Sequence, residues 1–402
     1  MEPLTRRQVL RCSALGLAFA AGGARAAAAT GRSLLTVWLE GGPSQLETWD
    51  PHEKLSQCGL IPTRIEGVSF SSFYPRVAEA AHRLSVIRSV VSKEGDHERG
   101  TATLKTGHRP EAGVDYPSLG SLAAMRLPSP ALQIPAHVSL VKSQWPARAG
   151  LLGGRYDAFR VADPGGALEN LEPRAAGAHE ERRLSVTRML DARFGAAHQS
   201  AVTAERDTRD AALKMMSTEQ LEAFRLNGEP QKVRDAYGSS AFGRGCLVAR
   251  RLLEQGVRAV EVTLKGFDSH ARNREAHREA GETLDAALGM LLNELFERDL
   301  LQRTVVWVVG EFGRTPKVNK ADGRDHWPHA FSCLLGGGGI RGGVAFGETD
   351  PEGVKQEPKD PISVEDLSAT VLAGLGVDVN AELIAPSGRP VTNGNPERRL
   401  LL

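Results

Sequence analysis

The stretch that decides the fold is residues 304–339, which read TVVWVVGEFGRTPKVNKADGRDHWPHAFSCLLGGGG. It opens on an uninterrupted apolar run that is too short for a helix and rich in β-branched residues, so it predicts a buried strand. Glu311 follows this run at once, and Asp325 and His326 stand just before a second apolar run, FSCLL. In an open parallel sheet, ligands bind outside the carboxyl ends of the strands. We therefore expect Glu311, Asp325 and His326 to belong to a polar site, which we interpret as a metal site.

Length and charge restrict the class of protein. The 402 residues, of which 41% are hydrophobic and 5% aromatic, are enough for one large α/β domain or two ordinary ones. The 50 basic residues against 49 acidic ones leave a formal net charge of +1, so no overall field attracts nucleic acid or an anionic membrane. Recognition must therefore use a specific local pocket.

Residues 1–30 predict a twin-arginine signal peptide. Arg6 and Arg7 precede an apolar stretch, residues 14–21, and an alanine-rich region with A-x-A sites. The apolar stretch is too short to span a membrane. We expect export by the twin-arginine translocase to the periplasm or the extracellular space, with no membrane span after cleavage. A cytosolic amphipathic N-terminus is the alternative.

Three cysteines remain beyond the signal segment, Cys58, Cys246 and Cys333. They show no C-x-x-C spacing and their number is odd. The sequence therefore predicts no zinc knuckle and at most one disulfide.

Strands and helices alternate along the rest of the chain, and each strand runs into a polar loop. The predicted strands are 33–39, 84–91, 138–141, 257–264 and 305–309, and the predicted helices are 243–255, 275–299, 364–375 and one that ends at Thr106. Residues 110–177 are rich in Gly, Pro and Ala and are interpreted as loop and cap structure. Residues 178–240 are interpreted as an inserted helical region that packs on its own core. We predict one α/β domain over residues 31–402, with a right-handed βαβ unit.

Polar side chains gather at four strand ends. Three of them are Asp50, Asp96 and His97, and the other six, which we predict as metal ligands, are Glu40, Asp268, His270, Glu311, Asp325 and His326. Imidazole nitrogen together with carboxylate oxygen suits zinc or manganese, and carboxylates alone favour magnesium or calcium. Two such ions about 4 Å apart would clamp the attacking and leaving oxygens of a phosphate or sulfate ester. The sequence therefore predicts a divalent metal site.

Plainer explanations exist for single members of this set. Glu40 in a Glu-Gly-Gly-Pro turn could cap that turn, and His97 could bind the backbone. The histidines that we interpret as surface or supporting residues are His108, His277 and His329, the last being the alternative to His326. Gly336–Gly339 lack the Lys and Ser/Thr of a phosphate-binding loop, so we interpret them as a tight turn.

Five short motifs, spread over nearly the whole chain, carry a resemblance to a known family. They are Glu40-Gly-Gly-Pro-Ser, Thr106-Gly-His-Arg-Pro, Phe267-Asp-Ser-His, Gly310-Glu-Phe-Gly-Arg-Thr-Pro and Gly323-Arg-Asp-His-Trp-Pro. After a twin-arginine leader, this set resembles the bacterial exported family called domain of unknown function 1501. That family is similar to the alkaline phosphatase and sulfatase superfamily. The resemblance implies a mixed, mostly parallel sheet between helices and a metal-dependent ester hydrolase ancestry.

The resemblance also implies roles for single residues. Those that match superfamily ligands are Glu40 after the first strand, Asp268 with His270 in the third motif, and His326 as the last histidine. Glu311 stands in the place of the Asp of an Asp-His-Gly motif, and Phe312 stands in the place of its His. One expected metal ligand is therefore replaced by a phenyl ring.

The place of the nucleophile also departs from the superfamily. The modified nucleophile of sulfatases lies nine residues before the position of Thr106, and here that place is occupied by His97, with Asp96 beside it. His97 and Asp96 are therefore the candidate catalytic residues, and Thr101 and Thr103 are the substitutes.

Two functions are compatible with these residues. The first is an exported, metal-dependent hydrolase of sulfate or phosphate esters, acting on a small-molecule or polysaccharide substrate. The second is a non-catalytic binding or assembly protein that keeps the fold without the nucleophile.

Overall fold

The computed structural model describes residues 31–402 except 170, 172–176, 196–198 and 386. The predicted signal peptide, residues 1–30, lies outside the described residues. Within those residues, no helix is long and apolar enough to cross a membrane. Cys58, Cys246 and Cys333 are free thiols, so no two of them form the one disulfide that the sequence allowed.

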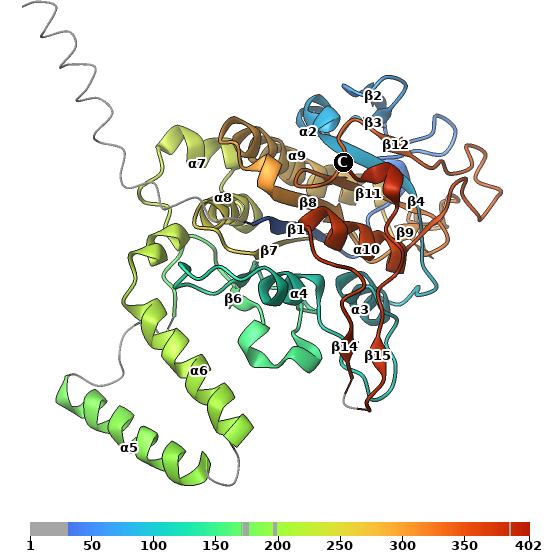
Figure 1. Ribbon diagram of the computed structural model, residues 1–402. Helices are drawn as coiled ribbons and strands as arrows, with labels where there is room; N and C mark the ends of the chain where they lie inside the picture. The colour runs from blue at the N-terminus through green and yellow to red at the C-terminus, as the bar shows by residue number, and fades with distance from the viewer. Residues whose placement is uncertain (1–30, 170, 172–176, 196–198, 386) are drawn as a thin grey trace, which may run out of the picture. The chain divides into compact units, whose positions relative to one another are not determined.

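A mostly parallel sheet forms the centre of the fold (Figure 1). Its strands are β1 Ser33–Glu40, β4 Leu84–Val91, β5 His137–Leu140, β6 Phe159–Val161, β7 Ala259–Lys265, β8 Thr304–Val309, β11 Phe331–Gly336, β12 Ala345–Phe346 and β13 Ile362–Ser363. They lie in the order β12-β4-β11-β8-β1-β7-β5-β6, with β13 also paired to β4. Among these strands only β11 is antiparallel to its neighbours, β4 and β8. The predicted α/β fold with a mixed, mostly parallel sheet is confirmed.

Helices cover both faces of the sheet (Figure 1). The helices that do so include α2 Pro75–Ala80, α3 His97–Thr106, α4 Leu119–Arg126, α8 Ala241–Glu254, α9 Asn273–Glu297 and α10 Val364–Leu375, with α7 Gln231–Tyr237 packed on α8 and α9. Helices α5 Ala178–Gly195 and α6 Gln199–Met216 pack against each other away from the sheet (Figure 1). One apolar core joins the sheet to α2, α8 and α9, and a second joins its other face to α3, α4 and α10. Three two-stranded ribbons complete the fold: β2 Leu60–Pro62 with β3 Ser69–Ser71, β9 Gly313–Arg314 with β10 His326–Trp327, and β14 Leu383–Ile384 with β15 Pro390–Val391.

The apolar runs form strands because both faces of the sheet are covered. In β1, Leu35 and Val37 enter the core beneath α8 and α9, whereas Leu34 and Trp38 enter the core beneath α4 and α10. This alternation is the two-residue period of a strand, and burial on both sides makes the whole run apolar. A continuous apolar run of this length is therefore a central strand.

Residues 110–177 are more regular than the sequence suggested. The predicted strand at 138–141 is present as β5, but α4 and β6 also lie in this segment, so its interpretation as loop and cap was wrong for them. Both elements are short, and the helix LGSLAAMR mixes small and apolar residues without a clear polar face. Residues 178–240 contain α5, α6 and α7. The predicted packing on the protein's own core is wrong for α5, where Val186, Met189, Leu190 and Phe194 are exposed.

The direction of β11 decides where the preceding loop lies. The sequence pattern predicts an open parallel sheet on both sides of the segment before this strand. Because β11 runs antiparallel to β8, its first residue lies at the same edge as the last residue of β8. Residues just before Phe331 therefore reach the edge at which β1, β4, β7 and β8 end, which we call the carboxyl rim.

We predict that Leu288→Ala lowers the free energy of unfolding by about 2–5 kcal/mol. Leu288 lies in α9, is fully buried, and belongs to the core between this helix and the sheet. Urea denaturation of the two purified proteins measures the loss. Glu279→Ala, at an exposed position of the same helix, is the matched control and should change the value by less than about 0.5 kcal/mol. Equal effects of the two substitutions would contradict the assigned core.

Candidate metal centre

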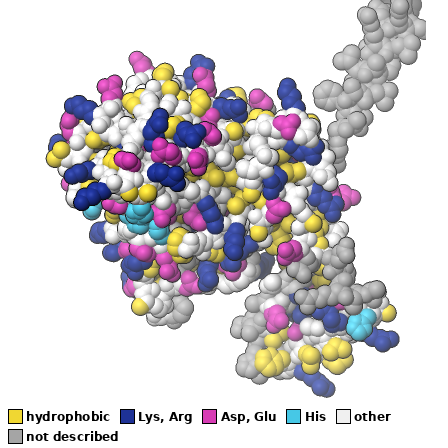
Figure 2. Space-filling model, turned by 180° about the vertical axis from the view of Figure 1, so that it is seen from behind, with side chains coloured by type: hydrophobic (Ala, Val, Ile, Leu, Met, Phe, Trp, Pro, Cys, Tyr) yellow, Lys and Arg dark blue, Asp and Glu magenta, His cyan; other side chains and the backbone are white. Residues whose placement is uncertain are grey.

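Six of the predicted site residues lie together at the carboxyl rim. They are His97, Asp268, His270, Glu311, Asp325 and His326, and they contact one another over sequence separations of up to 214 residues. His97 is the first residue of α3, directly after β4, while the others follow β7 or β8 or precede β11. Figure 2 shows the molecule from behind relative to Figure 1, and on this face histidine side chains form a patch beside acidic and basic side chains.

Glu311 is hydrogen-bonded to His97 through the Nδ1 atom of the ring. The carboxylate of Glu311 is fully buried, and its Oε1 lies 2.8 Å from His97 Nδ1 and accepts the Gly41 N–H at 2.9 Å. The close approach needs glycine at position 41, because a Cβ there would lie 2.4 Å from the Asp268 nitrogen. The hydrogen bond to Glu311 raises the pKa of His97, although partial burial opposes it. Glu311 therefore acts on His97 rather than pointing at the centre of the cluster.

The other two histidines are oriented in the same way. His326 Nδ1 lies 2.7 Å from the carbonyl oxygen of Gly95, and His270 Nδ1 lies 2.9 Å from Asp325 Oδ1. Burial lowers the pKa of His326, which favours its neutral form. The hydrogen bond from His270 lowers the pKa of Asp325, so this carboxylate stays ionised. Each of the three rings thus has an acceptor at Nδ1.

Asp268 lies between the three rings. Its carboxylate oxygens are 3.4 Å from His97 Nε2, 3.3 Å from His270 Nε2 and 3.6 Å from His326 Nε2. Although desolvation would raise the pKa of Asp268, the guanidinium of Arg314, 2.7 Å away, brings it below its usual value. The centre of the cluster therefore holds an ionised carboxylate.

The donor set fits a metal ion. A neutral imidazole that donates from Nδ1 has a lone pair at Nε2, so with all three rings neutral the three Nε2 atoms around Asp268 would be free to bind a cation. The Nε2 atoms of His270 and His326 are 3.0 Å apart, within hydrogen-bond distance, and a cation bound to both nitrogens would take the place of that hydrogen bond. One ligand atom from each of His97, Asp268 and His326 lies within 4.8 Å of the others. Metal-binding histidines commonly donate their second nitrogen to a carboxylate or a carbonyl, as all three do here.

Three other predicted residues lie elsewhere. Glu40 is buried and accepts hydrogen bonds from Ser143 Oγ at 2.6 Å and the Gln144 N–H at 3.0 Å. Asp96 caps α3 by accepting the Arg99 N–H, and Asp50 accepts a hydrogen bond from Thr349. Their carboxylates serve the backbone and the loops, and the contacts described for these three carboxylates do not include the histidine cluster.

The alternative residues are also outside the cluster. Thr101 and Thr103 are 1% exposed, so neither is an accessible nucleophile. His277 is fully buried, and burial lowers its pKa to about 4. His108 stacks on Tyr116, and His329 contacts Trp327.

Sequence reasoning missed two groups that shape the centre. Arg314 is fully buried and binds Asp268, and Trp145 stacks on His97 with ring centroids 5.7 Å apart. The motif Gly-Arg-Thr-Pro, which begins two residues after Glu311, was the available signal for Arg314. Trp145 lies in a Gly- and Pro-rich stretch without periodicity, which gives no comparable signal.

The fold and the cluster define an α/β protein with a histidine and carboxylate centre at the carboxyl rim of a mostly parallel sheet. The chain belongs to the family described as "Protein of unknown function (DUF1501)", which matches residues 31–401. The resemblance inferred from the five motifs is thereby confirmed.

Similar solved structures include sulfatases and a member of the alkaline phosphatase superfamily. A sulfatase from Pseudoalteromonas sp. is 12% identical, with a TM-score of 0.40, over 93% of this chain and 72% of that one. A putative sulfatase from Bacteroides thetaiotaomicron is 10% identical, with a TM-score of 0.40, over 92% and 76%. The superfamily member, from Vibrio parahaemolyticus, is 10% identical with a TM-score of 0.40, over 87% and 67%. These values are too low to indicate an activity. Among curated proteins, none matches the sequence.

We predict that Glu311→Gln lowers the pKa of His97 in the metal-free protein. The substitution removes the negative charge that favours the imidazolium but keeps an acceptor near Nδ1. The pKa of His97 is higher in the folded protein than in the unfolded chain. The pairing of His97 with Glu311 therefore stabilises the fold fully at a pH below the unfolded pKa, and this stabilisation is lost as the pH rises through the folded pKa. Titration of the His97 ring protons by NMR measures the shift. Asp325→Asn, which removes the charge beside His270 instead, is the control, and an equal shift of His97 in both variants would contradict the assignment.

Proposed function

We propose that the protein is a metal-dependent hydrolase of phosphate or sulfate esters. The observation that carries the proposal is the convergence of three imidazole Nε2 atoms on Asp268, with an acceptor behind each Nδ1. Three nitrogen donors and one carboxylate favour zinc or manganese over magnesium or calcium, which prefer oxygen ligands. The divalent ion would be held by His97, Asp268 and His326, with His270 adjacent.

Each residue of the centre has a part in this proposal. A bound divalent ion supplies Lewis-acid chemistry that polarises an ester oxygen. Arg314 keeps Asp268 ionised, Glu311 orients His97, and the Gly95 carbonyl orients His326. The Asp325 and His270 side chains are 58% and 48% exposed, so they form the side of the centre that an ester can approach from solvent.

Room for the rest of a substrate lies nearby. A cleft of about 590 Å³ is lined by Ser92, Lys93, Arg109 and His329 among others. His329, which lines this cleft, is three residues from His326, so the Cα atoms of the two histidines lie within about 11 Å of each other. Its volume suits a small molecule or part of a polysaccharide ester.

Export completes the proposal. Arg6 and Arg7 with the apolar stretch that follows support a twin-arginine signal peptide. The translocase would then be a partner during export, and the folded protein would act in the periplasm or outside the cell.

A non-catalytic binding or assembly protein is the second candidate. It is favoured by Phe312, whose ring lies 5.1 Å from that of His97 and 4.4 Å from that of His326, where the resemblance places a histidine ligand. Such a protein would bind the metal ion but would not turn over an ester.

We predict that His326→Ala lowers the metal content of the purified protein well below one ion per chain. The substitution removes one of the three converging nitrogen atoms, and elemental analysis measures the loss. His329→Ala is the matched control, because this histidine is close in sequence but lies outside the cluster. Equal metal content in wild type and His326→Ala would remove His326 from the centre.

Turnover is tested on the metal-loaded wild type. Hydrolysis of 4-nitrophenyl sulfate or 4-nitrophenyl phosphate, lost in His326→Ala and kept in His82→Ala, supports the hydrolase, because His82 is an exposed residue before β4 that lines neither the centre nor the cleft. Stoichiometric metal without hydrolysis of either ester supports the second candidate.

A further inference from the structure

The loop of residues 141–146 enters the carboxyl rim through a strained residue. Val141, directly after β5, has a φ of +67°, a left-handed conformation that a β-branched side chain rarely adopts. Its N–H donates to the Val161 carbonyl at 2.9 Å. Strain of this kind persists only where surrounding contacts enforce it, and it clusters at functional sites. The contacts that hold the loop therefore need an explanation.

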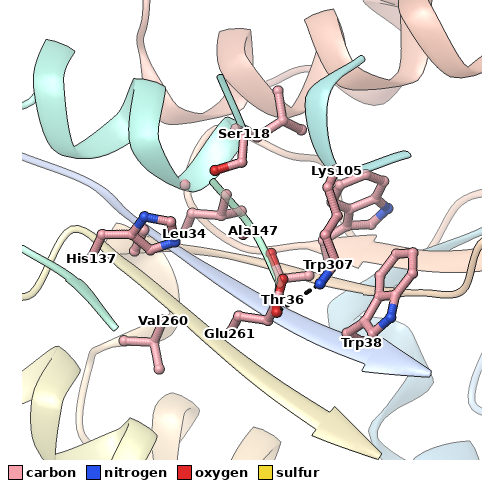
Figure 3. A pocket seen from close by; sticks show the side chains of 13 residues that line it. Leu34, Thr36, Trp38, Lys105, Ser118, His137, Ala147, Val260, Glu261 and Trp307 are labelled. Carbon is pink, nitrogen blue, oxygen red and sulfur yellow. Dashed lines mark hydrogen bonds and ion pairs between the residues drawn. The ribbon is translucent and has the colours of Figure 1, made fainter. Parts of the chain in front are cut away.

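The first contact with the loop comes from Lys105, which is itself part of a buried ion pair. Lys105 of α3 lies 2.8 Å from Glu261 of β7, and the two side chains are 5% and 6% exposed. Figure 3 shows Lys105 reaching toward Glu261 beside a small cavity of about 20 Å³. The same ammonium donates to the Trp145 carbonyl at 3.0 Å and lies 4.7 Å from the ring of Trp38. Since apolar residues often replace a buried ion pair without loss of stability, stability alone does not account for Lys105.

The second contact comes from the end of β1. Glu40 accepts hydrogen bonds from Ser143 Oγ and the Gln144 N–H, and its other oxygen lies 3.6 Å from Lys265. Glu40 and Lys105 thus bind the loop on both sides of Gln144. Neither side chain has a described contact with the histidines.

The contacts from Lys105 and Glu40 together fix the position of the Trp145 ring. Its plane is inclined by 11° to that of His97, with the centroids 5.7 Å apart. Glu311 and Asp268 contact the two nitrogens of His97, and the rings of Phe312 and His326 meet it tilted or edge-on, so Trp145 is the ring that lies parallel to its plane. A stacked indole restricts rotation of the imidazole out of that plane.

We propose that Trp145 is a positioning residue for His97, and that Lys105 and Glu40 act on the metal centre through it. The inference rests on the proposed function, because it takes His97 as a ligand. Substitution of groups that orient a metal ligand typically weakens metal binding by 10–100-fold. The loop would therefore set the affinity of the centre from outside it.

The first test uses the metal-free protein. The ring current of Trp145 should shift the NMR signal of the His97 ring proton, and this shift should disappear in Trp145→Leu and remain in Trp145→Phe. It should also disappear in the double variant Lys105→Met/Glu261→Gln, which removes both buried charges and so leaves none unpaired. Trp327→Leu, whose ring contacts His329 instead, is the control. A shift that survives in the double variant overturns the role of Lys105.

The second test measures the dissociation constant for Zn²⁺ and the visible spectrum of bound Co²⁺, which reports the coordination geometry. We expect Trp145→Leu and the double variant to raise the dissociation constant about 10-fold or more and to change the spectrum, with Trp145→Phe close to wild type. Thermal unfolding of the metal-free proteins separates this effect from lost stability. Unchanged affinity and spectrum in Trp145→Leu overturn the positioning role and leave the proposed function standing. A wild type that binds neither ion overturns the proposed function and, with it, this inference.

Discussion

One buried guanidinium ties the carboxyl rim together. Arg314 is fully buried and donates to the carbonyl oxygens of Gly41, Gly42 and Arg324 and to the carboxylate of Asp268. Those partners lie after β1, before β10 and after β7, so three loops share one cation. A buried charge is tolerated only when acceptors surround it, which means that each loop must keep its place for the others to keep theirs. The arrangement of Asp268 toward the three histidines follows from this constraint.

Much of the fold could be predicted because the strands that form the rim are strongly patterned. The apolar runs of β1, β4, β7 and β8 and the glycine stop after α10 have local signals that do not depend on distant contacts. The direction of β11 has no such signal. The prediction that Asp325 and His326 lie beside Glu311 assumed parallel strands, but residues that precede a parallel strand would lie at the opposite edge. They meet Glu311 because β11 is antiparallel.

The candidate site could be predicted only in part, for a similar reason. A carboxylate at a strand end can serve a metal ion or a loop, and the difference for Glu40 lies in Ser143 and Gln144, about a hundred residues away. Asp96 precedes a helix, and an Asp in that position commonly caps the helix, as it does here. The same residue after a strand could equally belong to a site, so the sequence alone does not separate the two roles. Family membership supports the motifs but assigns no activity. The role of Trp145 depends on its contact with His97, which is 48 residues away in the sequence, and no local pattern indicates it.

The polar cluster is divided between two parts of the chain. Arg314 and His326 face each other across the β9 and β10 ribbon, and Glu311 and Asp325 flank it, so one hairpin between β8 and β11 carries most of the charged groups. His97, Asp268 and His270 come from the sheet edge. Within the described residues, the β9 and β10 ribbon pairs with no strand of the central sheet, so the half of the centre that it carries is held there by side-chain contacts such as those of Arg314 rather than by the hydrogen bonds of the sheet.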